Sequence, residues 1–154
     1  MASYQPVSLA HPEVELRLAI LLPASHYCSV HCELITVTPC LLEAYEVEFE
    51  ALSYCWGKEI ATNTIFINGK SHQVTPNLEH ALRCLRYRFH RRLLWIDAIC
   101  IDQSNLQERG KQVKRMDQIY RFAKQVNVWL GPESRESSSR RAMELLNYIG
   151  AQVE

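Results

Sequence analysis

Polar and aromatic side chains follow three predicted strands of this chain at the points where the strands end. The first group is Ser53-Tyr54-Cys55-Trp56-Gly57, the second runs from Asp97 to Asp102-Gln103, and the third is Gly131-Pro132-Glu133. If the strands are parallel, these loops meet at one edge of the sheet, where open α/β sheets bind ligands. Together they offer hydroxyl groups, carboxylates, an amide and an indole face. We therefore expect the turns after Tyr54, Ile101 and Leu130 to open into one shared acidic cavity.

Asp97 interrupts an otherwise apolar run over residues 93–101, which predicts a strand covered on both faces. A buried carboxylate is costly without hydrogen bonds or a cationic partner, which either Arg109 or a cluster of backbone groups could supply. Asp97 is then either a structural carboxylate that braces a loop or an active-site acid with a tuned pKa. Asp102 is better explained as a turn or capping residue.

Glu108 lies one turn into a helix predicted to begin at Ser104, which with Gln107 fits a capping box. The helix dipole alone favours a Glu at this position. The functional alternative is that Glu108 faces the carboxyl edge of the sheet and binds a ribose hydroxyl. Trp56 similarly is either a core residue or a platform for a flat ring such as adenine or nicotinamide. Trp95 and Trp129 lie within predicted strands and are expected in the core.

Other motifs give weaker signals. The segment HYCSVHC at 26–32 has the residue types of a zinc site but not its spacing, so no metal is expected. Arginines cluster near the end of the predicted helix 76–89, where they either complement the helix dipole or bind phosphate: Arg86, Arg88, Arg91 and Arg92. No Walker loop, GxGxxG, HExxH or GxSxG motif is present.

Composition excludes several classes of protein. The chain has 154 residues with 17 Lys+Arg and 17 Asp+Glu, so it lacks the positive field that nucleic acids and anionic membranes require of a partner. Its 47% hydrophobic and 22% charged residues are typical of a folded domain rather than a disordered one. No secretory signal precedes the six cysteines, and no apolar stretch is long enough to span a membrane. We expect reduced, mostly buried thiols in a cytoplasmic protein.

The order of the predicted elements indicates an α/β fold. Strands are expected over 14–22, 32–38, 46–54, 93–101 and 126–130, with a hairpin around Asn68-Gly69. Helices are expected over 76–89, from Ser104 to Ala123, and around 142–149. Alternating strands and helices predict a mostly parallel sheet with covering helices, beside an N-terminal strand pair and the hairpin. Residues 1–13 are expected to form a flexible arm and 14–154 a single domain.

Four segments together resemble the fungal heterokaryon incompatibility (HET) domain. FEALSYCWG at 49–57 resembles its YxALSYxWG signature, and VTPNL at 74–78 is similar to its VTxNL step. LWIDAICIDQ at 94–103, with Glu108-Arg109 and Gln112-Val113, resembles its LWIDAICINQxxxxERxxQV block, and VWLG at 128–131 fits its end. The resemblance covers roughly residues 14–150. Phe49 and Asp102 depart from the usual Tyr and Asn. Family members are commonly longer, with a variable C-terminal region, so the chain resembles the isolated module or a short member of the family.

This resemblance implies a role in fungal allorecognition, in which HET domains execute regulated cell death after unlike hyphae fuse. HET domains are also described as distant relatives of TIR domains, which implies a TIR- or flavodoxin-like three-layer sandwich. Many TIR domains cleave NAD+ after self-association, so NAD+ becomes the candidate substrate, with no further cofactor required. The resemblance also implies self-association and contact with other incompatibility or NLR-type proteins.

Cleavage of the nicotinamide–ribose bond develops positive charge on the ribose, which a fixed carboxylate stabilises or traps. Under the resemblance the candidate carboxylates are Glu108 and Asp97, followed by Glu144, the position nearest to the catalytic Glu of TIR domains. Trp56 would stack on the ring, Ser53 and Arg109 would contact ribose or phosphate, and Asp102 would alter the charge nearby. Two alternatives remain open: a non-enzymatic module that kills by assembly and partner recruitment, and an inert adaptor that needs a further C-terminal region.

Overall fold

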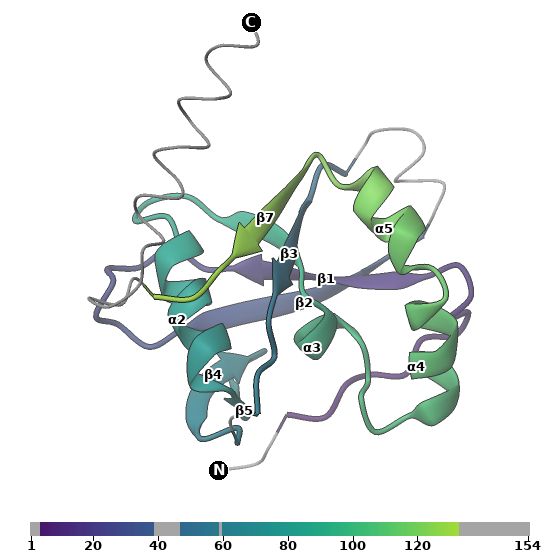
Figure 1. Cartoon of the computed structure of the whole chain (residues 1–154), viewed down its shortest axis with the longest axis horizontal. Helices are drawn as coiled ribbons and strands as arrows, with labels where there is room; N and C mark the ends of the chain where they lie inside the picture. The colour runs from purple at the N-terminus through teal and green to yellow at the C-terminus, as the bar shows by residue number, and fades with distance from the viewer. Residues whose placement is uncertain (1–3, 39–46, 59, 133–154) are drawn as a thin grey trace, which may run out of the picture.

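A computed structural model describes residues 4–38, 47–58 and 60–132 of the chain (Figure 1). Seven strands form one sheet: β1 (Leu16–Leu21), β2 (His31–Val37), β3 (Glu50–Tyr54), β4 (Asn63–Ile67), β5 (Lys70–Val74), β6 (Arg92–Trp95) and β7 (Gln125–Trp129). Four helices lie in the described residues: α2 (Pro76–Leu85), α3 (Asp97–Cys100), α4 (Leu106–Val113) and α5 (Met116–Phe122). The strands are ordered β5-β4-β2-β1-β6-β3-β7 across the sheet, so the fold is α/β as expected.

The sheet is mixed, and the prediction of a mostly parallel sheet is wrong. The three strands expected to carry the site are parallel neighbours, because β3 pairs parallel with both β6 and β7. The central strand β1 instead runs antiparallel to β2 and to β6. A short connection joins β1 to β2, and short connections produce antiparallel neighbours. The β4–β5 hairpin adds a third antiparallel pairing.

The core lies along the middle strands. Leu16, Leu18, Leu21, Leu94 and Trp95 are all fully buried. Neighbouring β1 positions such as Leu18 and Ala19 point to opposite faces, and both are buried, so the sheet is covered on both sides at this strand. Its near-continuous apolar sequence follows from this double cover.

Helices α2 and α5 cover opposite faces of the sheet. Ser53 of β3 hydrogen-bonds Tyr120 of α5, whereas Trp129 of β7 hydrogen-bonds Asn77 of α2. Trp129 is the register partner of Tyr54, the residue after Ser53. Because successive strand residues point to opposite faces, α5 and α2 lie on different sides of the sheet. This places helix, sheet and helix in three layers.

Local signals predicted the hairpin and the start of α2. Asn68 and Gly69 both have positive φ, as a two-residue hairpin turn requires. Thr75 is the N-cap of α2, its hydroxyl accepts a hydrogen bond from the Leu78 N–H, and Pro76 occupies the first turn. The helix ends at Leu85 rather than at residue 89. Arg86 adopts an extended backbone there, and its side chain binds carbonyl groups of the loop over residues 25–29.

Two longer predicted elements are each divided in the structure. The run 93–101 forms strand β6 and then the one-turn helix α3, because an apolar run alone does not distinguish a buried strand from a buried helical turn. The helix expected from Ser104 to Ala123 is divided into α4 and α5. Its N-cap is Asn105, whose side chain accepts from the Glu108 N–H, and not Ser104. The helix expected around 142–149 lies outside the described residues.

Residues 4–15 lie against the rest of the fold. Tyr4 is buried, and its N–H donates to the Ser71 carbonyl at 2.8 Å. The Gln112 amide donates to the carbonyls of Pro12 and Glu15, each at 2.7 Å. In the part of the chain that the structure describes, no helix combines the length and the apolar character needed to cross a membrane.

Candidate functional site

The loops after β3 and β6 meet at the carboxyl edge of the sheet. The Trp56 indole N–H, two residues beyond β3, donates to the Asp97 carboxylate at 2.9 Å. The turn after β7 joins them, because Pro132 and Trp56 line the same pocket. The three loops therefore lie near one another. However, the pocket that Trp56 and Pro132 line includes no residue of 97–103, and Asp102 and Gln103 line a separate cavity. This pocket is thus not the single shared acidic cavity expected from the sequence.

A pocket of about 400 Å³ opens between the loop after β3 and the first turns of α2. Gly57 has a φ of 67°, in the left-handed region, and this conformation turns the chain sharply after Trp56. The Trp56 indole is 44% exposed and provides an aromatic wall, so it is not a core residue. The lining residues are Cys55, Trp56, Gly57, Lys58, Pro76, Asn77, His80 and Pro132.

Asn77 connects the strands that frame the pocket. Its side-chain NH2 donates to the Cys55 carbonyl at 2.8 Å, and its Oδ1 accepts from the Trp129 indole N–H at 2.8 Å. His80, one turn further along α2, lies with its ring centroid 5.5 Å from that of Trp129. Sequence reasoning missed Asn77 and His80 as site residues. The VTPNL segment is similar to a family motif and overlaps the start of the predicted helix 76–89, but neither feature reveals a side chain that bridges two strands.

Asp97 is a partly desolvated carboxylate without a cationic partner among the described residues. Burial raises its pKa, while the hydrogen bonds from the Trp56 indole and the Ala98 N–H oppose that rise. Of the two partners considered, Arg109 is exposed, and its guanidinium lies 3.5 Å from the Gln103 carbonyl instead. The backbone alternative is supported, because the Ala98 N–H donates to Asp97 at 2.7 Å. The pKa values of Tyr54 and Tyr120 are raised, mainly by burial and secondarily by the negative charge of Asp97. Both phenols therefore lie close enough to Asp97 to interact with its charge.

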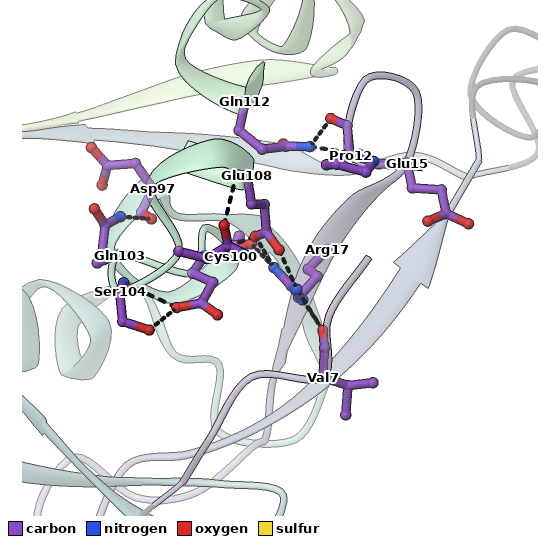
Figure 2. Close-up of polar contacts among 12 residues, drawn as sticks. Val7, Pro12, Glu15, Arg17, Asp97, Cys100, Gln103, Ser104, Glu108 and Gln112 are labelled. Carbon is purple, nitrogen blue, oxygen red and sulfur yellow. Dashed lines mark hydrogen bonds and ion pairs between the residues drawn. The ribbon is translucent and has the colours of Figure 1, made fainter. Parts of the chain in front are cut away.

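Glu108 forms a buried ion pair with Arg17, as Figure 2 shows. Both side chains are 2% exposed, and the two Arg17 terminal nitrogens donate to the two carboxylate oxygens at 2.5 and 3.0 Å. Burial raises the pKa of Glu108, but the hydrogen bonds from Arg17 and from the Asp102 N–H outweigh it and lower the pKa. Arg17 also donates to the Cys100 and Val7 carbonyls. Glu108, which lies on α4, therefore connects α4 to β1 and to the loop after α3. It does not line the pocket beside Trp56.

The remaining candidates lie apart from the pocket or outside the description. Ser53 points to the α5 face and bonds Tyr120. Asp102 accepts from the N–H and hydroxyl of Ser104 at 3.0 and 2.6 Å, which confirms its role in a turn. It lines a separate cavity of about 310 Å³ that also includes Tyr4. Glu144 lies outside the described residues.

The arginine and cysteine clusters have structural surroundings. Arg86 binds carbonyls of the loop over residues 25–29, and Arg92 pairs with Glu50, so these two arginines are engaged by the protein itself, which argues against the phosphate-binding alternative. The five described cysteines are free: Cys32 and Cys100 are buried, and three are exposed, contrary to the expectation of mostly buried thiols. Burial raises the pKa of Cys32 to about 12, which disfavours a metal-binding thiolate. Across residues 4–38, 47–58 and 60–132, no three His, Cys, Asp or Glu side chains gather as a metal site.

The geometry defines an α/β protein with its candidate pocket at the carboxyl edge of parallel strands. Comparison with known families then places it: the chain belongs to the family described as Heterokaryon incompatibility protein (HET), whose model matches residues 49–153. It is 36% identical to "Heterokaryon incompatibility protein 6, OR allele" of Neurospora crassa over 96% of this chain. The chain spans 23% of that relative's length. No solved structure matches it.

Proposed function

We propose that this chain is a death-effector module of fungal heterokaryon incompatibility and that its pocket cleaves the nicotinamide–ribose bond of NAD+ after self-association. Family membership supports the incompatibility role. The parallel strands β6, β3 and β7, with α2 and α5 on opposite faces, support a TIR- or flavodoxin-like core. The single observation that carries the chemistry is the Trp56–Asp97 pair beside an open pocket.

In the proposed reaction the bond between ribose C1′ and the nicotinamide nitrogen breaks, and its electron pair leaves with nicotinamide. Positive charge develops on the ribose, and water then adds to C1′ and releases a proton. The Asp97 carboxylate stabilises that charge through space, because burial strengthens its field. For charges about 4–8 Å apart at an effective dielectric constant near 20, the stabilisation is roughly 2–4 kcal/mol. The Trp56 indole holds Asp97 in place and presents its face to the ring.

The experiment measures nicotinamide release from NAD+ by the concentrated protein. Asp97→Asn is expected to lower the rate by roughly 30- to 1,000-fold, which corresponds to the 2–4 kcal/mol above. Asp117→Asn is the matched control, because Asp117 is an exposed carboxylate on α5. If the oligomeric wild-type protein releases no nicotinamide, or if the two variants behave alike, the catalytic proposal is rejected.

One observation favours a second function, that of a non-enzymatic signalling module. Strand β7 lies at the edge of the sheet, and three alternating apolar residues on it and just beyond it are exposed: Val126 at 43%, Val128 at 65% and Leu130 at 75%. Exposed apolar edge strands are surfaces on which chains associate. If assembly alone kills, Val128→Lys will abolish toxicity in fungal cells while Asp97→Asn leaves it intact. The opposite pattern would support the enzyme.

A further inference from the structure

Two basic side chains line the pocket beside Trp56. Lys58 lies two residues after Trp56 on the loop that follows β3, and His80 faces the pocket from α2. Among the described lining residues there is no Asp or Glu. The Lys58 ammonium brings a positive charge to the pocket, and the His80 ring adds hydrogen-bonding nitrogens. Such a pocket favours an anionic ligand.

The basic groups of the pocket differ from the buried arginines in what they contact. Arg17, Arg86 and Arg92 direct their guanidinium groups to protein carboxylates and carbonyls. Within the described ranges, Lys58 and His80 form no ion pair with a carboxylate. Among the described residues, no carboxylate competes with a ligand for their nitrogens, whereas the buried arginines maintain the fold.

The pocket also limits the shape of its ligand. Trp56 lines the pocket and is 44% exposed, and the two basic groups lie in the same cavity. The volume of about 400 Å³ lies in the lower part of the usual range of roughly 300–1,000 Å³ for small-molecule sites. A ligand with one flat ring, one sugar and one phosphoryl group suits this arrangement. The second half of a dinucleotide would then lie outside the pocket.

We propose that Lys58 and His80 form a phosphate-binding subsite, so that the pocket takes a nucleotide and discriminates against the corresponding nucleoside. The phosphoryl oxygens accept hydrogen bonds from the Lys58 ammonium and the His80 ring. The ring stacks on Trp56, and the sugar between them lies towards Asp97. The catalytic consequence rests on the proposed function, whereas the preference for a phosphoryl group is a binding property and stands separately.

The binding test titrates the full chain with AMP and with adenosine and follows tryptophan fluorescence. AMP is expected to bind about tenfold or more tightly than adenosine, as one charge-assisted hydrogen bond supplies. Lys58→Gln and His80→Gln should each remove most of that difference. Lys70→Gln, an exposed lysine of the β4–β5 hairpin outside the pocket, should leave it unchanged. Equal affinities for AMP and adenosine, or wild-type discrimination in both pocket variants, would overturn the subsite.

A parallel turnover measurement separates this proposal from the catalytic one. Nicotinamide mononucleotide and nicotinamide riboside are supplied as substrates, and nicotinamide release is compared. If AMP binding depends on Lys58 but no nicotinamide is released, the subsite stands and the cleavage reaction fails. If both substrates are cleaved with equal kcat/KM, the reaction stands and the subsite fails.

Discussion

Replacing Glu108 by Gln removes one charge from the buried pair with Arg17 and leaves the guanidinium without a counter-charge. Both side chains are 2% exposed, so water does not replace the lost partner. Removing one member of such a pair costs about 3–5 kcal/mol. For a domain of this size each kcal/mol corresponds to roughly 2–4 °C in Tm, so the expected decrease is roughly 6–20 °C.

Denaturation with guanidinium chloride, followed by circular dichroism, measures the decrease in the free energy of unfolding. Lys111→Gln is the control, because the Lys111–Glu13 pair is exposed and such pairs contribute at most about 1 kcal/mol. The double variant Arg17→Met/Glu108→Leu should recover part of the stability, since no uncompensated charge remains. Recovery stays incomplete because the Cys100 carbonyl and the Asp102 N–H each lose a buried partner, at about 1–3 kcal/mol each.

The contribution of Glu108 to stability should also depend on pH. The pKa of Glu108 in the folded protein lies below its ordinary value of 4.5. Its contribution to the free energy of unfolding is therefore complete above about pH 4.5 and is lost as pH falls through the lowered pKa. The difference between wild type and Glu108→Gln should shrink over that acid range. Glu50, whose pKa is also lowered, remains in both proteins and cancels from the difference.

A different outcome would refute the structural role of Glu108. Unfolding free energies within about 1 kcal/mol at pH 7, or a difference that stays constant between pH 3 and 7, would mean that the pair does not stabilise the fold. Under the proposed function, the same variant, assayed well below its Tm, should release nicotinamide at the wild-type rate, because Glu108 does not line the pocket. Loss of activity with full stability would restore Glu108 as a catalytic candidate.

Two further predictions concern the elements around the pocket. Thr75→Ala removes the hydroxyl that accepts from the Leu78 N–H and should cost about 1 kcal/mol in urea denaturation, while Thr64→Ala on β4 tests for a general effect of threonine loss. Burial raises the pKa of Asp97, so ionisation of this carboxyl group destabilises the folded state of the wild type. Asp97→Asn does not ionise there, so its free energy of unfolding relative to wild type should increase as pH rises from about 3 to 7. A difference that moves the other way in pH-resolved denaturation would exclude this account.

The local features of the fold could be predicted from the sequence because their causes are local. The Asn68-Gly69 turn and the Thr75-Pro76 helix start each depend on adjacent residues. The antiparallel pairing of β1 with β6 could not be predicted in the same way, because it joins segments about 70 residues apart. The division of the 93–101 run was also missed, since Ile99 and Cys100 are buried in a helical turn as fully as they would be in a strand.

The position of the candidate site could be predicted from the sequence, but the contacts of its side chains could not. Its place at the strand ends follows from the order of elements, and Trp56 and Asp97 do meet there. The surroundings of Glu108 depend on Arg17, 91 positions earlier in the chain, and no local pattern indicates that partner. Asn77 shows the same limit, because its bonds to Cys55 and Trp129 arise only when three separate elements pack together.

Asp97, at the start of α3, and Glu108, on α4, are carboxylates with different surroundings and different expected roles. Glu108 is the more deeply buried, yet the Arg17 charge and the Asp102 N–H lower its pKa, so its burial is compensated and it stabilises the protein. Among the described residues, Asp97 receives hydrogen bonds from neutral donors, Trp56 and Ala98, and its pKa is raised. Environments that shift neighbouring carboxyl groups in opposite directions assign them different roles. Asp97 is therefore the carboxylate that would stabilise a developing positive charge most. In the proposed reaction, the cationic ribose would give Asp97 the compensating charge that Arg17 gives Glu108.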